Sequence, residues 1–157
     1  MGRQAVDRKQ VLRSRRGRFH DDPEAEPTTY LAATIQTAWL EVSARFGQVR
    51  PDPAAFRLFR VKLPAGGLAD LADAKVRSRL GLSQADLAAD PAPAACSRAA
   101  RKLRAEGPGR GGPIGLTYPS LRDRPKGLCA AIFLERVKKV GVEPAETEWR
   151  EFMEKLT

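Results

Sequence analysis

Three side chains that can do chemistry, Arg18, Tyr30 and Glu41, stand at nearly even intervals in the first third of the chain. A guanidinium is a planar fork that binds phosphate or carboxylate, and a phenol stacks and forms hydrogen bonds. A carboxylate takes up protons or stabilises positive charge. These groups could line one pocket. Ordinary packing is the alternative, because Glu41 and Arg45 have the i, i+4 order that favours an ion pair on a helix surface.

Other site chemistries have weaker support in this sequence. His20 is the only histidine, and no serine or cysteine can be assigned to it as a nucleophile. Cys96 and Cys129 lie far apart in apolar segments, so we expect both to be buried and expect no metal site. The segment GPGRGGPIG lacks the lysine and Ser/Thr of a phosphate-binding P-loop, and it predicts a plain loop.

Length and composition indicate a soluble protein with one core. A chain of 157 residues suits a single domain. Its 42% hydrophobic and 30% charged residues argue against a disordered or membrane class. No apolar run approaches the roughly 20 residues of a membrane span, and no secretory signal is visible. We therefore expect a cytoplasmic location and no membrane partner.

The formal charge of +9 is unevenly distributed. Residues 1–18 are rich in arginine and lysine with Asp7 as their acid, whereas the C-terminal stretch GVEPAETEWREFMEKLT leans acidic. Such a balance suits a solvated surface, a polyanion, an acidic protein partner or an anionic small substrate. Because residues 1–17 show no clear period, we predict a basic N-terminal arm there and a folded domain over residues 18–157.

The candidate residues fall on elements that the sequence predicts. The segment TTYLA is typical of a short strand, and it contains Tyr30. A helix follows, capped by Thr34, ending near Phe46 and stopped by Gly47. Glu41 lies on the flank of that helix, at the edge of its predicted buried stripe. The stripe consists of Ile35, Ala38, Trp39, Val42 and Phe46.

The rest of the chain alternates irregularly between strand and helix patterns. The segments RLFRVKLP, IGLTYPS and GLCAAIFLERV predict strands, and the glycines of PGRGGP predict a flexible loop. Helices are predicted up to Gly81, from Ser83, and in the alanine-rich segment stopped by Gly107. A final amphipathic helix carries Trp149, Phe152, Met153 and Leu156. This order predicts an α+β domain and does not fit a doubly wound sheet.

Several of these segments together resemble the RES domain, a family named for its arginine, glutamate and serine. GRFH…TYLAATIQTAWLEV is similar to the opening of that domain. FRVKLPAGGLADLADAKVRSRLGLS, CSRAARKLRAEG…IGLTYPSLRD and GLCAAIF resemble its next elements in the same order. The resemblance covers about residues 17 to 135. His20 stands where the family commonly has asparagine, and its role cannot be read from the sequence.

The resemblance implies a fold and a chemistry. RES domains have a split mixed β-sheet core similar to ADP-ribosyltransferases, with surrounding helices and nicotinamide adenine dinucleotide (NAD) as substrate in the cleft. They are toxins that cleave the nicotinamide–ribose bond and pass ADP-ribose to water, phosphate or a protein side chain. By this resemblance Glu41 is the catalytic carboxylate and Arg18 contacts phosphate. Tyr30 then contacts nicotinamide or ribose, and Ser120 reaches the carboxamide or ribose.

The resemblance also implies partners. The toxin of such a bacterial pair is neutralised by a small helical antitoxin with a DNA-binding domain, which blocks the cleft. DNA would then be reached only through the antitoxin, and a homo-oligomer is possible. Two other readings stay open: a basic nucleic-acid-binding module without catalysis, which lacks a recognition motif, and an inactive RES-like interaction domain. The acceptor, the antitoxin and the physiological target cannot be read from the sequence.

Overall fold

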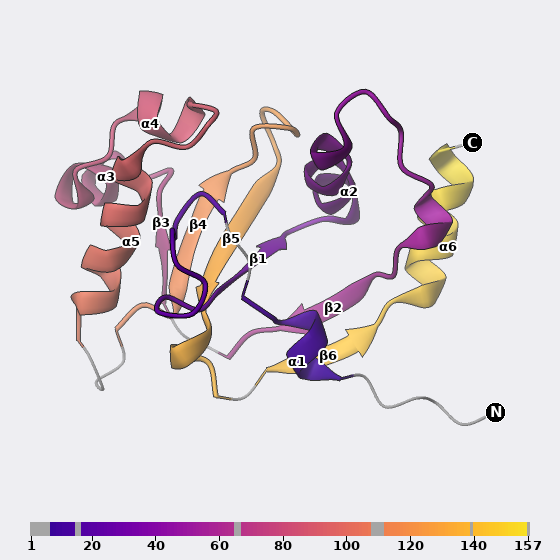
Figure 1. Cartoon of the computed structure of the whole chain (residues 1–157), viewed down its shortest axis with the longest axis horizontal. Coiled ribbons are helices and arrows are strands. Elements are labelled where there is room, and N and C mark those ends of the chain that lie inside the picture. The colour runs from indigo at the N-terminus through magenta and orange to yellow at the C-terminus, as the bar shows by residue number, and fades with distance from the viewer. Residues whose placement is uncertain (1–6, 15–16, 65–66, 108–111, 139, 157) are drawn as a thin grey trace.

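Two β-sheets, flanked by helices on either side, form the frame of this α+β chain (Figure 1). The structure is a computed structural model, and it describes residues 7–14, 17–64, 67–107, 112–138 and 140–156. The larger sheet has the strand order β1-β5-β4-β3. Its strands are β1 (Thr28–Ala32), β3 (Leu68–Asp70), β4 (Gly115–Pro119) and β5 (Leu128–Phe133). The smaller sheet pairs β2 (Phe59–Lys62) with β6 (Gly141–Pro144).

The larger sheet is mixed in direction, as the resemblance to the RES domain implies. Strand β5 runs antiparallel to both β1 and β4, whereas β3 runs parallel to β4. The register sets Tyr30 opposite Ala131 and Tyr118 opposite Cys129. Because side chains alternate along a strand, these residues share one face of the sheet.

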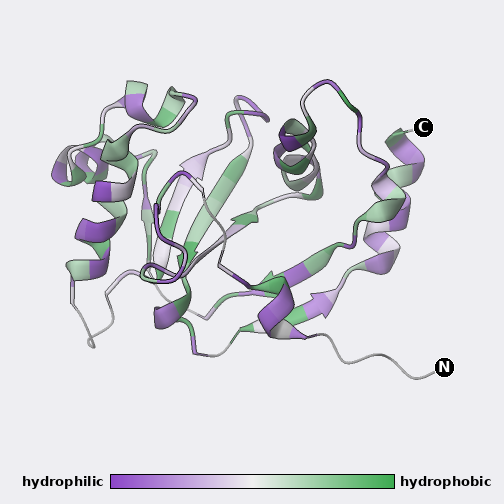
Figure 2. Ribbon diagram, viewed as in Figure 1, coloured by the Kyte–Doolittle hydropathy of each residue, from purple (hydrophilic) through white to green (hydrophobic). Residues whose placement is uncertain are grey.

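That face carries the hydrophobic core. Three helices lie together beside it (Figure 1): α3 (Ala74–Leu80), α4 (Gln84–Ala88) and α5 (Ala94–Ala105). The apolar stretch of β5 lies at the centre of the sheet (Figure 2). Large or apolar side chains without solvent exposure fill the space between the sheet and the helices. They include Phe19, Leu71, Cys96, Ala99, Ala100, Leu103, Leu116, Ala131 and Phe133.

A second apolar group joins the smaller sheet to helices α2 (Ile35–Ser43) and α6 (Glu146–Leu156). The ring centroid of Trp39 lies 5.7 Å from that of Trp149 and 5.8 Å from that of Phe56. We call these residues, together with Phe46 and Phe152, the aromatic cluster. The aromatic cluster holds the side of α2 that carries Trp39 against α6. The opposite side of α2 therefore faces the larger sheet.

Most predicted elements are confirmed, with local differences. Helix α2 begins after the Thr34 cap as predicted, but its last turn, Ala44–Phe46, is a 3-10 helix. The prediction that Phe46 is buried is wrong, since 45% of its surface is exposed. Thr37 was absent from the predicted stripe but is fully buried, and the hydrogen bond of its hydroxyl to Asp123 offsets the cost of burying that group. Strand β6 was not predicted, because the run GVEP contains a glycine and a proline.

The N-terminal segment is partly described. Helix α1 (Arg8–Val11) is a single turn, and Ser14 Oγ accepts a hydrogen bond from Thr28 N–H. The predicted boundary after residue 17 stays a prediction. Most of the predicted PGRGGP loop lies outside the described residues. In the part of the chain that the structure describes, no helix combines the length and apolar character needed to cross a bilayer.

Candidate functional site

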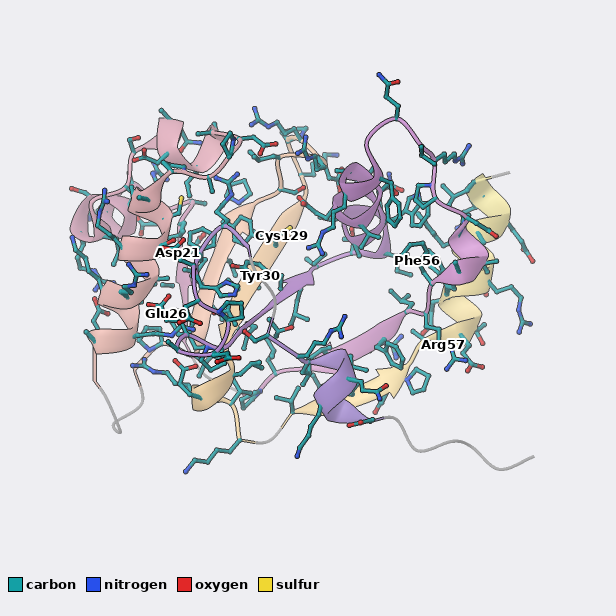
Figure 3. The ribbon with its side chains drawn as sticks, in the orientation of Figure 1. Asp21, Glu26, Tyr30, Phe56, Arg57 and Cys129 are labelled. Atoms are coloured by element: carbon teal, nitrogen blue, oxygen red, sulfur yellow. The ribbon has the colours of Figure 1, made fainter. Side chains whose placement is uncertain are left out.

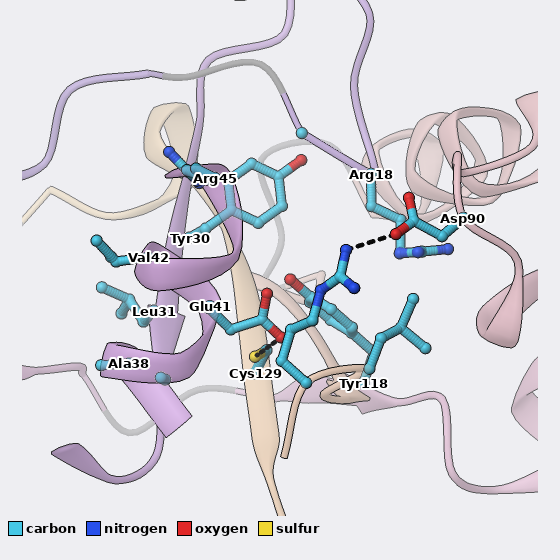
Figure 4. Close-up of a pocket in the computed structure, with 14 residues that line it drawn as sticks. Arg18, Tyr30, Leu31, Ala38, Glu41, Val42, Arg45, Asp90, Tyr118 and Cys129 are labelled. Atoms are coloured by element: carbon cyan, nitrogen blue, oxygen red, sulfur yellow. Dashed lines mark hydrogen bonds and ion pairs between the residues drawn. The ribbon is translucent and has the colours of Figure 1, made fainter. Parts of the chain in front are cut away.

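Arg18, Tyr30 and Glu41 line one pocket, at the end of the core face of the larger sheet (Figure 4). The cavity has a volume of about 280 Å³. Its walls come from the segment before β1, from β1 itself, from α2, from the segment after α4, and from β4, β5 and the loop between them. Side chains from distant parts of the sequence thus converge on one opening, and Arg18, Tyr30 and Glu41 are among them, as the family resemblance implied.

Glu41 is held by Ser120, which lies directly behind it. Ser120 Oγ accepts hydrogen bonds from the backbone N–H groups of Arg122 and Asp123, both at 3.1 Å. Its own proton is therefore free to be donated to Glu41 Oε1, 2.6 Å away. Ser120 is buried and does not line the cavity. The structure therefore brings Ser120 to Glu41, and its predicted contact with substrate stays a prediction.

The β4–β5 loop, residues 120–127, holds helix α2 at a second point. Thr37 Oγ1 donates to Asp123 Oδ2 at 2.6 Å, one helical turn before Glu41. Asp123 also donates its N–H to Ser120 Oγ, so three hydrogen bonds run from Thr37 through Asp123 and Ser120 to Glu41, and the series begins and ends on helix α2. This series fixes the rotation of α2 and therefore the direction of the Glu41 carboxylate.

We expect Thr37→Val to lower the free energy of unfolding by about 1–3 kcal/mol, because it leaves the Asp123 carboxylate without its donor in a partly buried place. Valine keeps the branched shape, so the change tests the hydroxyl. Urea unfolding measures the loss. Thr147→Val, on the exposed side of α6, is the matched control and should stay within about 0.5 kcal/mol of the parent. Equal effects of the two changes would contradict a special role for the Thr37 bond.

Arg18 uses its guanidinium to hold the end of α4. One terminal nitrogen donates to the carbonyl of Asp86 at 3.2 Å, and the other donates to the carbonyl of Ala89 at 2.7 Å. Carbonyls at the end of a helix lack partners within the helix, so a cation there is stabilised. Arg18 thus lines the pocket and also fixes one of its walls.

Tyr30 joins the segment before β1 to the sheet. Its hydroxyl accepts a hydrogen bond from Phe19 N–H at 3.0 Å and lies 2.9 Å from His20 Nδ1. Burial raises the pKa of Tyr30 well above its ordinary value, so the phenol stays neutral. A Cβ on Gly17 would lie 2.3 Å from the Tyr30 ring, so only glycine fits beside it. Tyr30 and Cys129 both lie toward the centre of the molecule (Figure 3).

Cys129 and Tyr118 complete the floor of the pocket. Cys129 Sγ lies 3.7 Å from Glu41 Oε1. Burial, followed by the nearby Glu41 carboxylate, raises the pKa of the Cys129 thiol to about 12. Burial likewise raises the pKa of Tyr118 well above its usual range. Both groups are therefore neutral near pH 7, and the charges of the pocket belong to its carboxylates and guanidinium groups.

At pH 8 we expect iodoacetamide to alkylate Cys129 in the folded protein at least about a hundredfold more slowly than in urea, because only the thiolate reacts. Residue-specific mass spectrometry measures both rates. Equal alkylation rates in the folded and unfolded states would contradict this environment.

The raised pKa of Cys129 also affects the stability of the fold. The contribution of the buried neutral thiol to the free energy of unfolding is present below about pH 9, the ordinary pKa of a thiol, and is lost as the pH rises toward about 12.

Sequence reasoning did not assign the charged residues at the mouth of the pocket to the site, and it considered Arg45 only as an ion-pair partner of Glu41. Asp90, after α4, forms an ion pair of 2.5 Å with Arg122 of the β4–β5 loop. Arg45 also lines the cavity, and no ion pair joins it to Glu41 or to any other described residue. Among the described residues no group of three or more histidine, cysteine or acidic side chains could hold a metal ion.

These features define an α+β domain with two carboxylates and three guanidinium groups around a pocket at the end of its core sheet. The chain belongs to the RES domain family, because the family model described as RES domain matches residues 7–152. The RES domain is a family associated with toxin–antitoxin systems. Searches of the curated proteins and of the solved structures found no match to the chain. The likeness of the fold to ADP-ribosyltransferases therefore stays a prediction.

Proposed function

We propose that this chain is the toxin of a toxin–antitoxin pair and that it cleaves the nicotinamide–ribose bond of NAD. The observation that carries the proposal is Glu41, which lines the pocket with one carboxylate oxygen fixed by the Ser120 hydroxyl. Membership of the RES family supports the toxin class. Arg18 and Tyr30, which lie in the segment that resembles the opening of the RES domain, line the same cavity.

The residue types suit this reaction. The bond between ribose C1′ and the nicotinamide nitrogen breaks, and its electron pair leaves with nicotinamide, which becomes neutral. Positive charge builds on the ribose, and the Glu41 carboxylate stabilises it. An acceptor hydroxyl, such as that of water, then forms a bond to C1′ and gives its proton to Glu41 or to solvent. Water, phosphate and a protein side chain are all chemically possible acceptors.

The size of the cavity suits one half of the substrate. A volume of about 280 Å³ lies just below the usual range for ligand pockets, about 300–1,000 Å³. The nicotinamide riboside half would occupy this space, between Tyr30 and Glu41. The pyrophosphate and adenosine would then extend to the mouth, where Arg122 and Arg45 stand.

The experiment is to incubate the purified protein with NAD and follow free nicotinamide, in buffers with and without phosphate. We expect nicotinamide release in both buffers if water accepts ADP-ribose, and release that depends on phosphate if phosphate is the acceptor. Label from adenine-labelled NAD that stays on protein would indicate transfer to a side chain. Absence of nicotinamide release in every arm, with added cell extract included, would overturn the proposed reaction.

We also propose that a cognate helical antitoxin neutralises the toxin by covering this pocket and that the pair acts in the cytoplasm, where NAD is available. The toxin would contact DNA only through the antitoxin. The mouth of the pocket presents Arg45 and Arg122, which suit an acidic or carboxylate-bearing segment of the partner. Unchanged nicotinamide release in a saturated complex with the antitoxin would contradict this mode of inhibition.

A further inference from the structure

We infer that Arg122 binds the phosphate groups of the substrate and that Asp90 occupies the same guanidinium when no substrate is present. The inference rests on the proposed function for the identity of the substrate, and it adds the residues that select a phosphate-bearing one. In this view the Asp90 carboxylate is an internal competitor of the substrate pyrophosphate.

The ion pair lies at the pocket, between two walls that are far apart in the sequence. Arg122 belongs to the β4–β5 loop, and Asp90 follows Ala89, whose carbonyl is held by Arg18. Both Asp90 and Arg122 line the cavity, and a dashed line marks their contact in Figure 4. Their side chains are 53% and 44% exposed, so a ligand entering the pocket can reach both.

Arg122 is better placed for phosphate than Arg18, which the family resemblance had suggested. Arg18 already donates from both terminal nitrogens to backbone carbonyls. The backbone N–H of Arg122 is fixed by Ser120 Oγ, whereas its side chain is engaged only with an exposed carboxylate among the described residues. The backbone of Arg122 is therefore held in place, while its guanidinium can exchange one anion for another.

The exchange is energetically favourable for a phosphate ligand. An exposed ion pair changes an equilibrium constant by no more than about fivefold, because solvent screens it and both side chains lose freedom. A guanidinium–phosphate contact is stronger, since it forms two parallel charge-assisted hydrogen bonds. Arg45, which lines the same cavity without an ion pair among the described residues, adds a second positive charge. A pyrophosphate would therefore displace the Asp90 carboxylate.

The test measures binding of inorganic pyrophosphate and of ADP-ribose by titration calorimetry to the whole chain, without reference to turnover. Asp90→Asn should tighten both ligands about two- to fivefold, because it removes a competitor worth that factor. Arg122→Ala should weaken both by about tenfold or more. Adding Asp90→Asn to Arg122→Ala should then change nothing further, because the competitor has lost its target. Nicotinamide riboside, which has no phosphate, should be insensitive to both changes.

The controls carry the same charge changes elsewhere. Glu143→Gln and Arg60→Ala each remove one member of an exposed ion pair at the smaller sheet, remote from the pocket. We expect both to bind pyrophosphate and ADP-ribose as the parent does. Thermal melts check that each variant is folded. Arg122→Lys, which keeps the charge without the fork, should recover only part of the lost affinity.

Three results would overturn the inference: no pyrophosphate or ADP-ribose binding by the folded parent, unchanged affinity in Arg122→Ala, or equal tightening by Asp90→Asn with and without Arg122. The last would indicate a general change in charge. Failure of the proposed function gives a different pattern, in which the ligands bind as expected but no nicotinamide is released. Conversely, nicotinamide release with affinities indifferent to Asp90 and Arg122 would keep the function and remove the phosphate site.

Discussion

Glu41→Gln lowers the rate of nicotinamide release by about a hundredfold or more, on the scale of other losses of electrostatic stabilisation in active sites. Glutamine keeps the shape of the side chain and can still accept the Ser120 hydroxyl at 2.6 Å, but it carries no charge to stabilise the ribosyl cation. Because that charge develops chiefly in the transition state, the effect should fall on kcat, with KM little changed. Steady-state nicotinamide release measures both constants.

The matched control is Glu151→Gln, an exposed position on α6 that loses the same charge far from the pocket. It should retain the parent rate, and both variants should melt within a few degrees of the parent. If the Glu41→Gln variant releases nicotinamide at the parent rate, the catalytic assignment of Glu41 is wrong. A large fall in its melting temperature would instead indicate that the carboxylate serves mainly to hold the β4–β5 loop.

Arg18→Ala lowers the rate of nicotinamide release to about one hundredth of the parent rate or less. It also lowers the free energy of unfolding by about 1–3 kcal/mol. The physical reason is the double use of its guanidinium. It fixes the carbonyls of Asp86 and Ala89 at the end of α4, so its removal frees the wall that carries Asp90. Nicotinamide release and urea unfolding measured on the same preparation separate the two effects.

Arg13→Ala provides the control for Arg18, because it removes an exposed arginine from the same N-terminal region. It should keep both activity and stability. Arg18→Lys should restore part of the stability and less of the activity, since an ammonium cannot hold two carbonyls in one plane as a fork does. Equal losses in Arg13→Ala and Arg18→Ala would indicate that the N-terminal arginines act only through their overall charge.

Local patterns predicted most of the elements. The Thr34 cap, the alternation in TTYLA and the apolar run in GLCAAIF each indicate an element that the structure confirms. Strand β6 was not predicted, because a four-residue edge strand that contains glycine and proline has no periodic signal. Phe46 was wrongly assigned to the core because a helical stripe says nothing about where the last turn leaves the surface of the domain.

The site was less accessible to sequence reasoning than the fold. Arg18, Tyr30 and Glu41 were identifiable from their place in a family pattern, and the structure does bring them to one cavity. The contacts of Ser120 with Glu41 and of Asp90 with Arg122 join residues far apart in the chain. Such pairs have no local spacing rule, and they follow only from the strand order and the path of the β4–β5 loop.

The series of hydrogen bonds that begins and ends on helix α2 and passes through the β4–β5 loop sets a limit on how this chain can vary. Surface loops usually accept insertions and deletions, because few of their residues are tied to the rest of the fold. Here residues 120 and 123 are both bonded to helix α2, and residue 127 bonds back to both. A change of one residue in loop length would therefore be transmitted to Glu41 as a rotation of the helix. Related chains that keep Glu41, Ser120 and Asp123 should therefore also keep the length of this loop.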